Sequence, residues 1–144
     1  MGYNNGMSKC IILDDDETFQ RLHRRRLIRL GLEEYMVFSF DSNEEALRFL
    51  EENPDVDRGV FDWNLNPYGR SGGPYTEGAV RRILETHGSV LLTSGTDDST
   101  GRLSELMRES GDEARLRFVD KRLLETGDYE FLVADTREWQ PQIS

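Results

Sequence analysis

The sequence predicts an α/β protein with one doubly wound sheet of five parallel strands and helices on both faces of the sheet. Short apolar runs alternate five times with longer stretches of helical periodicity, which is typical of parallel strands joined by helical crossovers. The 144 residues are enough for one domain with its own core, and they contain no internal repeat. Right-handed crossovers leave few topologies for such a chain.

The first half of the chain is predicted to supply three strands and two helices. Gly31 closes the first helix, because a left-handed glycine is a common helix end. Asp41 or Ser42 caps the second helix, with a Glu three residues further on in either case. This helix stops before Pro54, because proline disfavours helical backbone at the residue before it. The predicted ranges are 9–13, 35–40 and 59–61 for the strands, and 17–30 and about 41–52 for the helices.

Two polar residues fall within the apolar stripe of helix 17–30. The stripe itself is formed by Phe19, Leu22, Leu27 and Leu30. His23 and Arg26 project into it by their spacing, and the sequence alone assigns neither of them a role.

The second half is predicted to continue the alternation after a long Gly- and Pro-rich loop at 64–75. Gly88 and Gly111 are expected to stop the next two helices, and a break is expected at 126–128. The predicted helices are 76–87, 101–110 and 129–139, the last with Phe131, Leu132 and Trp139 facing inward, and the predicted strands are 89–92 and 116–119. Residues 95–100 are expected to form a polar loop, 1–8 a flexible N-terminal tail and 140–144 a C-terminal tail.

Composition excludes several classes of function. With 18 Lys and Arg against 28 Asp and Glu, the net charge is −10, which argues against direct nucleic-acid binding. No apolar run approaches the roughly 18 residues of a membrane span. The single cysteine, Cys10, cannot form an internal disulfide, so we expect a cytoplasmic protein. Two histidines and one cysteine make no His/Cys metal cluster, so any metal would be held by oxygen, with Mg²⁺ the first choice.

Reactive side chains follow four of the five predicted strands. Because the carboxyl ends of parallel strands lie at one edge of a sheet, these side chains should converge there. They are the acidic run Asp14, Asp15 and Asp16, then Asp62, then Thr93 and Ser94, and finally Asp120 and Lys121.

This set of side chains favours phosphoryl chemistry. A Mg²⁺ ion held by one or two carboxylates keeps positions open for phosphate oxygens. Asp62 could then attack a phosphoryl group as a carboxylate nucleophile. Lys121 and the Thr93 hydroxyl would each take one oxygen of the transferred group. Of the 18 basic residues only Lys9 and Lys121 are lysine, which favours a specific use for the compact ammonium of Lys121.

Over about residues 9–139 these pieces resemble the receiver domain of bacterial two-component response regulators. The matching segments are Ile12-Leu13-Asp14-Asp15, Val60-Phe61-Asp62, Leu91-Leu92-Thr93-Ser94 and Val119-Asp120-Lys121. The resemblance implies a flavodoxin-like fold with strand order 2-1-3-4-5 and Asp62 as phosphoacceptor. It also implies Mg²⁺ held by Asp15, Asp62 and the Asn64 carbonyl, with Asp14 assisting, and a switch formed by Thr93 and Phe118.

The same resemblance implies a signalling domain rather than an enzyme. Its phosphoryl donor would be a histidine kinase or a histidine phosphotransfer protein. A downstream protein would bind the face formed by the fourth helix, fifth strand and fifth helix, and a homodimer is possible.

Two features depart from the family pattern. Arg122 stands where the family has a proline after the lysine, often with a cis bond. A cis bond before a non-proline residue costs about 3–4 kcal/mol, so a trans bond is expected here. The loop at 64–75 is also several residues longer than usual, which bears on kinase choice and on access to the site.

Two other functions remain open at this stage. Residues 11–18 also fit the D-x-D-x-T signature of haloacid-dehalogenase-type phosphatases, with Asp14 as nucleophile and Asp16 as acid/base. That family needs a further strand ending in paired acids after Lys121, and it would leave Asp62 without a role. The other alternative is a receiver fold that acts by binding alone, against which the complete set of Asp15, Asp62, Thr93 and Lys121 argues.

Overall fold

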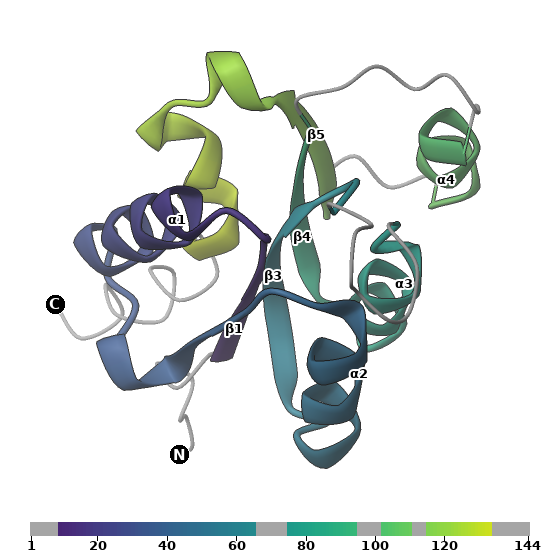
Figure 1. The fold of residues 1–144 in the computed structure, drawn as a ribbon, viewed down its shortest axis with the longest axis horizontal. Coiled ribbons are helices and arrows are strands. Elements are labelled where there is room, and N and C mark those ends of the chain that lie inside the picture. The colour runs from purple at the N-terminus through teal and green to yellow at the C-terminus, as the bar shows by residue number, and fades with distance from the viewer. Residues whose placement is uncertain (1–8, 66–74, 95–101, 111–114, 134–144) are drawn as a thin grey trace, which may run out of the picture.

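A computed structural model of the chain describes residues 9–65, 75–94, 102–110 and 115–133 (Figure 1). The two predicted tails, the loop at 95–100 and Trp139 lie outside these ranges. Within them, no helix combines the length and the apolar character that crossing a membrane requires.

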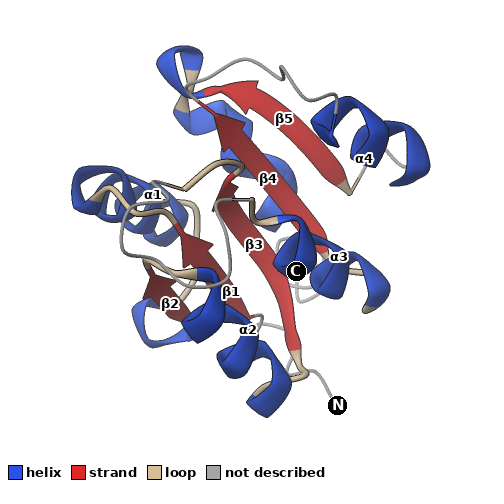
Figure 2. Cartoon of the chain, turned by 45° about the vertical axis from the view of Figure 1, so that its right-hand side comes forward, coloured by secondary structure: helices blue, strands red, loops and turns tan. Residues whose placement is uncertain are grey.

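Five parallel strands form a single sheet in the order β2-β1-β3-β4-β5, as predicted (Figure 2). The strands are β1 (Lys9–Leu13), β2 (Val37–Phe40), β3 (Val56–Asp62), β4 (Ser89–Ser94) and β5 (Leu116–Asp120). The central strand β3 pairs with β1 on one side and with β4 on the other.

Helices cover both faces of this sheet (Figure 1). The α-helices are α1 (Glu17–Arg29), α2 (Asn43–Glu52), α3 (Glu77–Glu85) and α4 (Arg102–Ser110). Short 3₁₀ helices are η2 (Glu34–Met36), η3 (Lys121–Leu123) and η4 (Thr126–Tyr129), and residues 130–133 are again α-helical. α1 and the segment after β5 lie on one side of the sheet, and α2, α3 and α4 lie on the other.

Alternating residues of each strand point to these two layers, so the core has two parts. In β1, Cys10 and Ile12 belong to the part that contains Leu27 of α1, whereas Ile11 and Leu13 belong to the part under α2 and α3. These four side chains are fully buried, because a strand covered on both faces has no solvent side.

The helix signals are confirmed for the first two helices. Asp16 caps α1 by accepting a hydrogen bond from the Thr18 backbone N–H at 2.9 Å. Gly31, with a φ of 121°, follows the end of α1 in the left-handed region. Of the two candidates for the second cap, Ser42 does the capping, accepting from the Glu45 backbone N–H at 3.4 Å.

Two strand starts differ from the prediction, and β3, β4 and β5 end one or two residues later than predicted. Tyr35 lies in η2 and is exposed, so β2 begins at Val37 rather than at Tyr35. β3 begins at Val56 rather than Gly59, because the polar Arg58 is tolerated in a central strand. Its Nε donates to the Leu132 carbonyl oxygen at 2.6 Å, which satisfies a buried guanidinium.

The predicted break at 126–128 is wrong. These residues form η4, which runs directly into the helical turn at 130–133. Asp128 and Glu125 make a reciprocal capping box that supplies partners for the free N–H groups of this start. Leu132 is buried and Phe131 is partly buried, as expected for their inward-facing positions.

The end of α3 also differs, since Gly88 is not the left-handed residue. His87 takes that conformation, with a φ of 63°. The Gly88 N–H bonds to the Ile83 carbonyl at 3.0 Å and the His87 N–H to the Leu84 carbonyl at 3.0 Å, which is the Schellman pattern. Glycine is required at 88 for another reason, because a Cβ there would lie 2.5 Å from the Asp57 carbonyl oxygen of β3.

Candidate functional site

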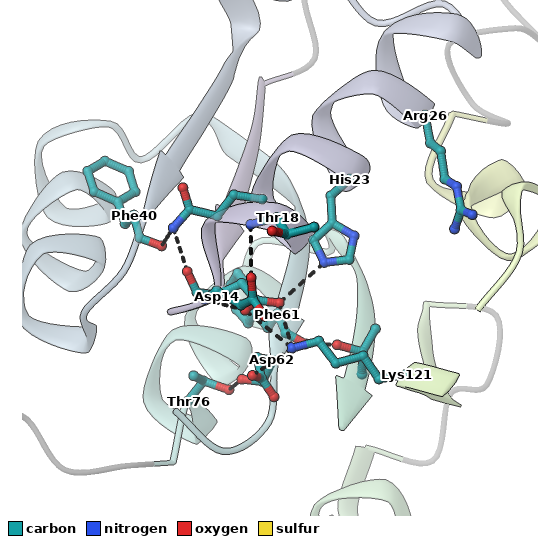
Figure 3. A network of polar contacts seen from close by, with 12 residues as sticks. Asp14, Thr18, His23, Arg26, Phe40, Phe61, Asp62, Thr76 and Lys121 are labelled. Atoms are coloured by element: carbon teal, nitrogen blue, oxygen red, sulfur yellow. Dashed lines mark hydrogen bonds and ion pairs between the residues drawn. The ribbon is translucent and has the colours of Figure 1, made fainter. Parts of the chain in front are cut away.

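Three strand ends bring the predicted acids and the lysine together at the carboxyl edge of the sheet (Figure 3). Asp14 and Asp15 directly follow β1, Asp62 is the last residue of β3, and Lys121 directly follows β5. Ligand oxygens of Asp14, Asp15 and Asp62 all lie within 4.8 Å of one another. The convergence predicted from the strand ends is therefore present for these four residues.

Lys121 bridges two of the three carboxylates. Its Nζ lies 3.0 Å from Asp62 Oδ2 and 3.0 Å from Asp14 Oδ2. The ammonium also sits 4.2 Å from the centre of the Phe19 ring of α1. A cation held by two anions and the face of an aromatic ring has a restricted position, which suits a group that must meet one particular oxygen.

The Asp62 carboxylate is poorly stabilised as an anion. It is 5% exposed, and its burial raises the pKa to about 6, with the Lys121 charge working against this and the Asp14 charge adding to it. The Asn64 backbone N–H donates to Oδ1 over a long 3.3 Å. A carboxylate in this condition gains from an added cation more than an ordinary one does.

Asp14 has the opposite character, although it is fully buried. Burial raises its pKa, but the His23 ring, the Lys121 charge and the Asp16 N–H together hold that pKa below its ordinary value. The Asp16 backbone N–H donates to Asp14 Oδ1 at 2.9 Å. Asp14 is therefore an anion at neutral pH.

Backbone contacts hold Asp62 and the residues after it in place. The Thr76 hydroxyl donates to the Asp62 carbonyl oxygen at 2.8 Å, and the Trp63 N–H donates to the Thr93 carbonyl oxygen at 2.7 Å. An isolated antiparallel bridge joins Asn64 to Tyr75, at the two ends of the long loop. The two ends of the loop are therefore held next to each other at the sheet edge.

Thr93 is the partner of Asp62 in the β3–β4 register. It is buried, and its hydroxyl lies 3.3 Å from the Phe61 carbonyl oxygen, to which it donates. The structure thus places Thr93 beside Asp62 along the sheet edge, with its hydroxyl bonded to the backbone.

Phe118 lies on β5, outside the core. It is 37% exposed and lines a surface cavity of about 380 Å³ together with Met107, Leu116, Arg117 and Val119. A half-exposed aromatic beside open space has room for a second side-chain conformation.

The donor set fits a Mg²⁺ ion. Three carboxylates with ligand oxygens this close together repel one another unless a cation lies between them, and hard oxygen ligands are those that Mg²⁺ prefers. At Asn64 the contact to Asp62 is made by the N–H group, so the carbonyl ligand implied by the resemblance stays a prediction.

The peptide bond before Arg122 is trans, as expected, since none of the described peptide bonds is cis. Asp120 accepts from the Arg122 backbone N–H at 2.9 Å and from its guanidinium at 3.0 and 2.6 Å. This contact caps η3 and orders the turn that carries Lys121.

Three residues that support Asp14 had no role assigned from the sequence. The Gln20 side chain donates to the Asp14 carbonyl oxygen. His23 Nε2 lies 3.4 Å from Asp14 Oδ2, and His23 Nδ1 lies 2.6 Å from the Tyr129 hydroxyl. The one signal for this network was a histidine within the apolar stripe of α1, because nothing near Tyr129 in the sequence points to His23.

Comparison with known proteins places the fold. The sequence matches no protein-family model and no curated protein. Among solved structures, a response regulator receiver protein from Sinorhizobium medicae is similar at 14% identity and a TM-score of 0.64, over 90% of this chain and 92% of that one. The N-terminal domain of a response regulator/sensory box/GGDEF protein from Carboxydothermus hydrogenoformans has 14% identity and a TM-score of 0.65, over 95% and 100% of the two chains.

The class that these comparisons define is the receiver-domain fold of response regulators. At such identities the likeness establishes the fold alone. A lysine decarboxylase from Francisella novicida has a TM-score of 0.59 over 95% of this chain and 18% of its own, at 18% identity. Function must therefore be argued from the side chains at the sheet edge.

Proposed function

We propose that this chain is a phosphoacceptor receiver domain, in which Asp62 takes a phosphoryl group from a phosphohistidine protein with the help of Mg²⁺. The observation that carries the proposal is the placement of Asp14, Asp15 and Asp62 within 4.8 Å of one another, with Lys121 Nζ 3.0 Å from Asp62 Oδ2. A solvated acidic cluster would leave its carboxylates exposed, whereas here Asp14 and Asp62 are buried and share a partly buried lysine.

The reaction forms one bond and breaks one. An oxygen of the Asp62 carboxylate bonds to phosphorus, and the bond from phosphorus to the donor's imidazole nitrogen breaks, with its electron pair leaving on that nitrogen. Charge develops on the phosphoryl oxygens, so neutralisation and positioning supply most of the catalysis. Lys121 would pair with one of these oxygens, which is supported by the 3.0 Å contact of its ammonium with Asp62 Oδ2.

When bound, Mg²⁺ would supply a Lewis acid between the carboxylates and the incoming phosphoryl oxygens. Asp15 and Asp62 would hold it, with the Asn64 carbonyl completing the protein ligands and Asp14 assisting. Lys121 would exchange a contact with a carboxylate for a contact with a phosphoryl oxygen. The Thr93 hydroxyl would exchange its hydrogen bond to the Phe61 carbonyl for one to another phosphoryl oxygen.

The output would follow from this exchange at Thr93. A shift of the Thr93 hydroxyl would leave space near the carboxyl end of β4, and Phe118 of β5 would move toward it. The downstream protein would then bind the face of α4, β5 and the segment after them. In this role the protein signals and does not turn over a small-molecule substrate.

The phosphatase alternative has weaker support. Its nucleophile, Asp14, is fully buried and already accepts hydrogen bonds from Lys121 and the Asp16 N–H. Its acid/base group, Asp16, caps α1 with its carboxylate. Asp62, by contrast, has few donors and a raised pKa, so an approaching phosphoryl group and cation stabilise it more.

The test is to locate the acyl phosphate. The protein is treated with acetyl phosphate and Mg²⁺, the acyl phosphate is reduced with borohydride, and the modified residue is identified by mass spectrometry. We expect the label on Asp62, no label after Asp62→Asn, and negligible turnover of p-nitrophenyl phosphate. Asp16→Asn is the matched control, because it removes a neighbouring acid and should leave labelling of Asp62 intact.

Two results would contradict the proposal in different ways. Label on Asp14, or phosphoester hydrolysis that survives Asp62→Asn, would promote the phosphatase. Absence of label on any residue, in a folded protein that also takes no phosphoryl group from phosphohistidine donors, would favour a module that acts by binding alone.

A further inference from the structure

Two buried polar atoms face each other behind the acidic site. His23 Nε2 and Asp14 Oδ2 lie 3.4 Å apart, and both side chains are fully buried. Within the described residues neither atom has a hydrogen bond of good geometry, although Asp14 Oδ2 is also ion-paired with Lys121. Leaving such a group without a partner costs about 1–3 kcal/mol, so each is the natural partner of the other.

The other ring nitrogen of His23 is already committed. Nδ1 lies 2.6 Å from the Tyr129 hydroxyl, which is itself fully buried. Arg26 Nη1 donates to the Tyr129 oxygen at 3.5 Å from the other side. The Tyr129 oxygen therefore accepts from Arg26, and the hydroxyl hydrogen of Tyr129 can be donated to His23 Nδ1. Figure 3 shows the His23 end of this series of contacts.

These contacts favour one tautomer of His23. A neutral imidazole carries a single N–H, on Nδ1 or on Nε2, and here Nδ1 faces the Tyr129 hydroxyl and Nε2 faces the Asp14 carboxylate. If that hydrogen were on Nδ1, the Nε2 lone pair would face the Asp14 carboxylate in a dry environment, and the two would repel each other. With the hydrogen on Nε2, the Tyr129 hydroxyl can donate to Nδ1, and the Nε2–H group faces the acceptor oxygen of Asp14.

We propose that His23, oriented by Tyr129, is a positioning residue that holds the Asp14 carboxylate in place for Mg²⁺ through its Nε2–H group. This inference rests on the proposed function, since it assigns a purpose to the pocket in which Asp14 lies. The role differs from that of Lys121, whose ammonium competes with a metal ion for the same oxygens. An imidazole N–H would orient the carboxylate from a position outside the metal's own ligands, as outer-shell partners do in other proteins.

Three substitutions separate positioning from packing. His23→Leu keeps a buried apolar volume and removes both ring nitrogens. His23→Gln is the conservative variant, because its amide N–H reaches about as far as Nε2–H. Tyr129→Phe keeps the ring that packs against α1 and removes the hydroxyl that orients His23. Leu27→Ala is the matched control, since it damages the same buried face of α1 one turn away without touching Asp14.

The measurement is a MgCl₂ titration of ¹⁵N-labelled protein, followed through the amide shifts of residues 14–16 and 62–64. We expect His23→Leu to weaken Mg²⁺ binding about tenfold or more, the usual effect of losing an outer-shell partner. Tyr129→Phe should weaken it less, and His23→Gln should restore most of it. Leu27→Ala should lower the free energy of unfolding and leave Mg²⁺ affinity within about twofold of the starting protein.

The imidazole ¹⁵N shifts of the same sample give a readout that packing does not move. We expect His23 to carry its proton on Nε2 both with and without Mg²⁺. A proton on Nδ1, or equal Mg²⁺ affinity in wild type and His23→Leu, would overturn this inference and leave the proposed function standing. Failure of the wild-type protein itself to bind Mg²⁺ would instead count against the metal pocket of the proposed function.

Discussion

Asp14 and Asp62 share the ammonium of Lys121, yet their pKa values are shifted in opposite directions. The difference comes from their remaining donors. Asp14 also has the His23 ring and the Asp16 N–H, whereas Asp62 has the Asn64 N–H at 3.3 Å. Asp14 is therefore held as an anion, whereas the Asp62 anion would be stabilised by a cation or by bonding to a phosphoryl group. Single hydrogen bonds set this difference between the two carboxylates.

The raised pKa of Asp62 makes a prediction about stability in metal-free protein. Its value of about 6 exceeds the ordinary 3.8, so the folded state binds a proton more tightly than the unfolded state does. The contribution of Asp62 to the free energy of unfolding should therefore fall as the pH rises through the window from 3.8 to about 6. Asp62→Asn removes the titration, so its stability relative to wild type should increase by about 2 kcal/mol between pH 4.5 and 7.5.

Urea unfolding in EDTA at several pH values measures this difference. Asp55→Asn is a control, because the contact with Lys9 lowers the pKa of that exposed acid below 3.8. Asp55 is then ionised in both the folded and the unfolded state above pH 4.5, so the stability difference between Asp55→Asn and wild type should stay nearly constant in this range. A constant difference between Asp62→Asn and wild type across this range would show that Asp62 titrates normally.

Lys121→Arg should leave the fold intact and weaken the response to phosphorylation. The lysine Nζ fits between two carboxylates and the Phe19 ring, and a planar guanidinium presents a fork where a point charge is held. The measurement is the change in amide shifts around Thr93 and Phe118 on phosphorylation. The same response in Lys121→Arg as in wild type would remove the specific role of the ammonium, and Lys9→Arg, away from the site, should respond as wild type does.

At the level of elements, the turns that the structure describes hold their backbone in different ways. The α3–β4 junction is an example, because a non-glycine residue takes the left-handed position and glycine takes the next one. His87 has a φ of 63°, a conformation that costs a residue with a side chain about 1 kcal/mol or more. Gly88 lies against β3, where a Cβ would meet a carbonyl oxygen at 2.5 Å and Ile83 Cγ2 at 2.7 Å.

A matched pair of substitutions tests this junction. Gly88→Ala should destabilise the protein by about 1–3 kcal/mol, since the added methyl displaces either β3 or Ile83. His87→Gly should stabilise it by up to about 1 kcal/mol, because glycine accepts a positive φ without strain. Chemical denaturation of the two variants and of wild type measures both changes in the free energy of unfolding. Equal effects of the two changes would mean that the junction is set by helix propensity alone.

At the scale of the whole molecule, the three acids of the site come from two adjacent strands. Asp14 and Asp15 follow β1, and Asp62 ends β3. A metal ion there links segments that are far apart in the sequence. It binds the folded state and has no comparable site in the unfolded chain, so it should stabilise the whole domain by mass action.

We therefore expect Mg²⁺ at ten times its Kd to raise the free energy of unfolding by about 1.4 kcal/mol. Asp15→Asn should abolish most of this gain while leaving the metal-free stability close to that of wild type. Trp63, which directly follows Asp62 and is buried, should change its emission on Mg²⁺ binding, and the change should persist after Trp139→Phe. No gain in stability and no change in emission up to about 10 mM Mg²⁺ would mean that Asp15 and Asp62 share no metal.

The sequence by itself determined the sheet, its two covering layers and the residues at each strand end. Strand–helix alternation is a local property, and a residue that directly follows a buried strand is carried to the sheet edge wherever that strand lies. Strand ends alone therefore predict the grouping of Asp14, Asp15, Asp62 and Lys121. Local rules failed where a residue's conformation depends on a distant contact, as at Arg58 within β3 and at Gly88 beside Asp57.

Only the tertiary structure decided what surrounds each acid. His23 and Tyr129 are separated by 106 positions in the chain, and helical periodicity states which face a residue occupies without stating what that face meets. The same holds for Thr93, whose hydroxyl is bonded to the Phe61 carbonyl, and for Phe118, which is 37% exposed beside a cavity that Met107 of α4 also lines. Ionisation and side-chain freedom are set by burial and by specific donors, which exist only after distant segments have packed together.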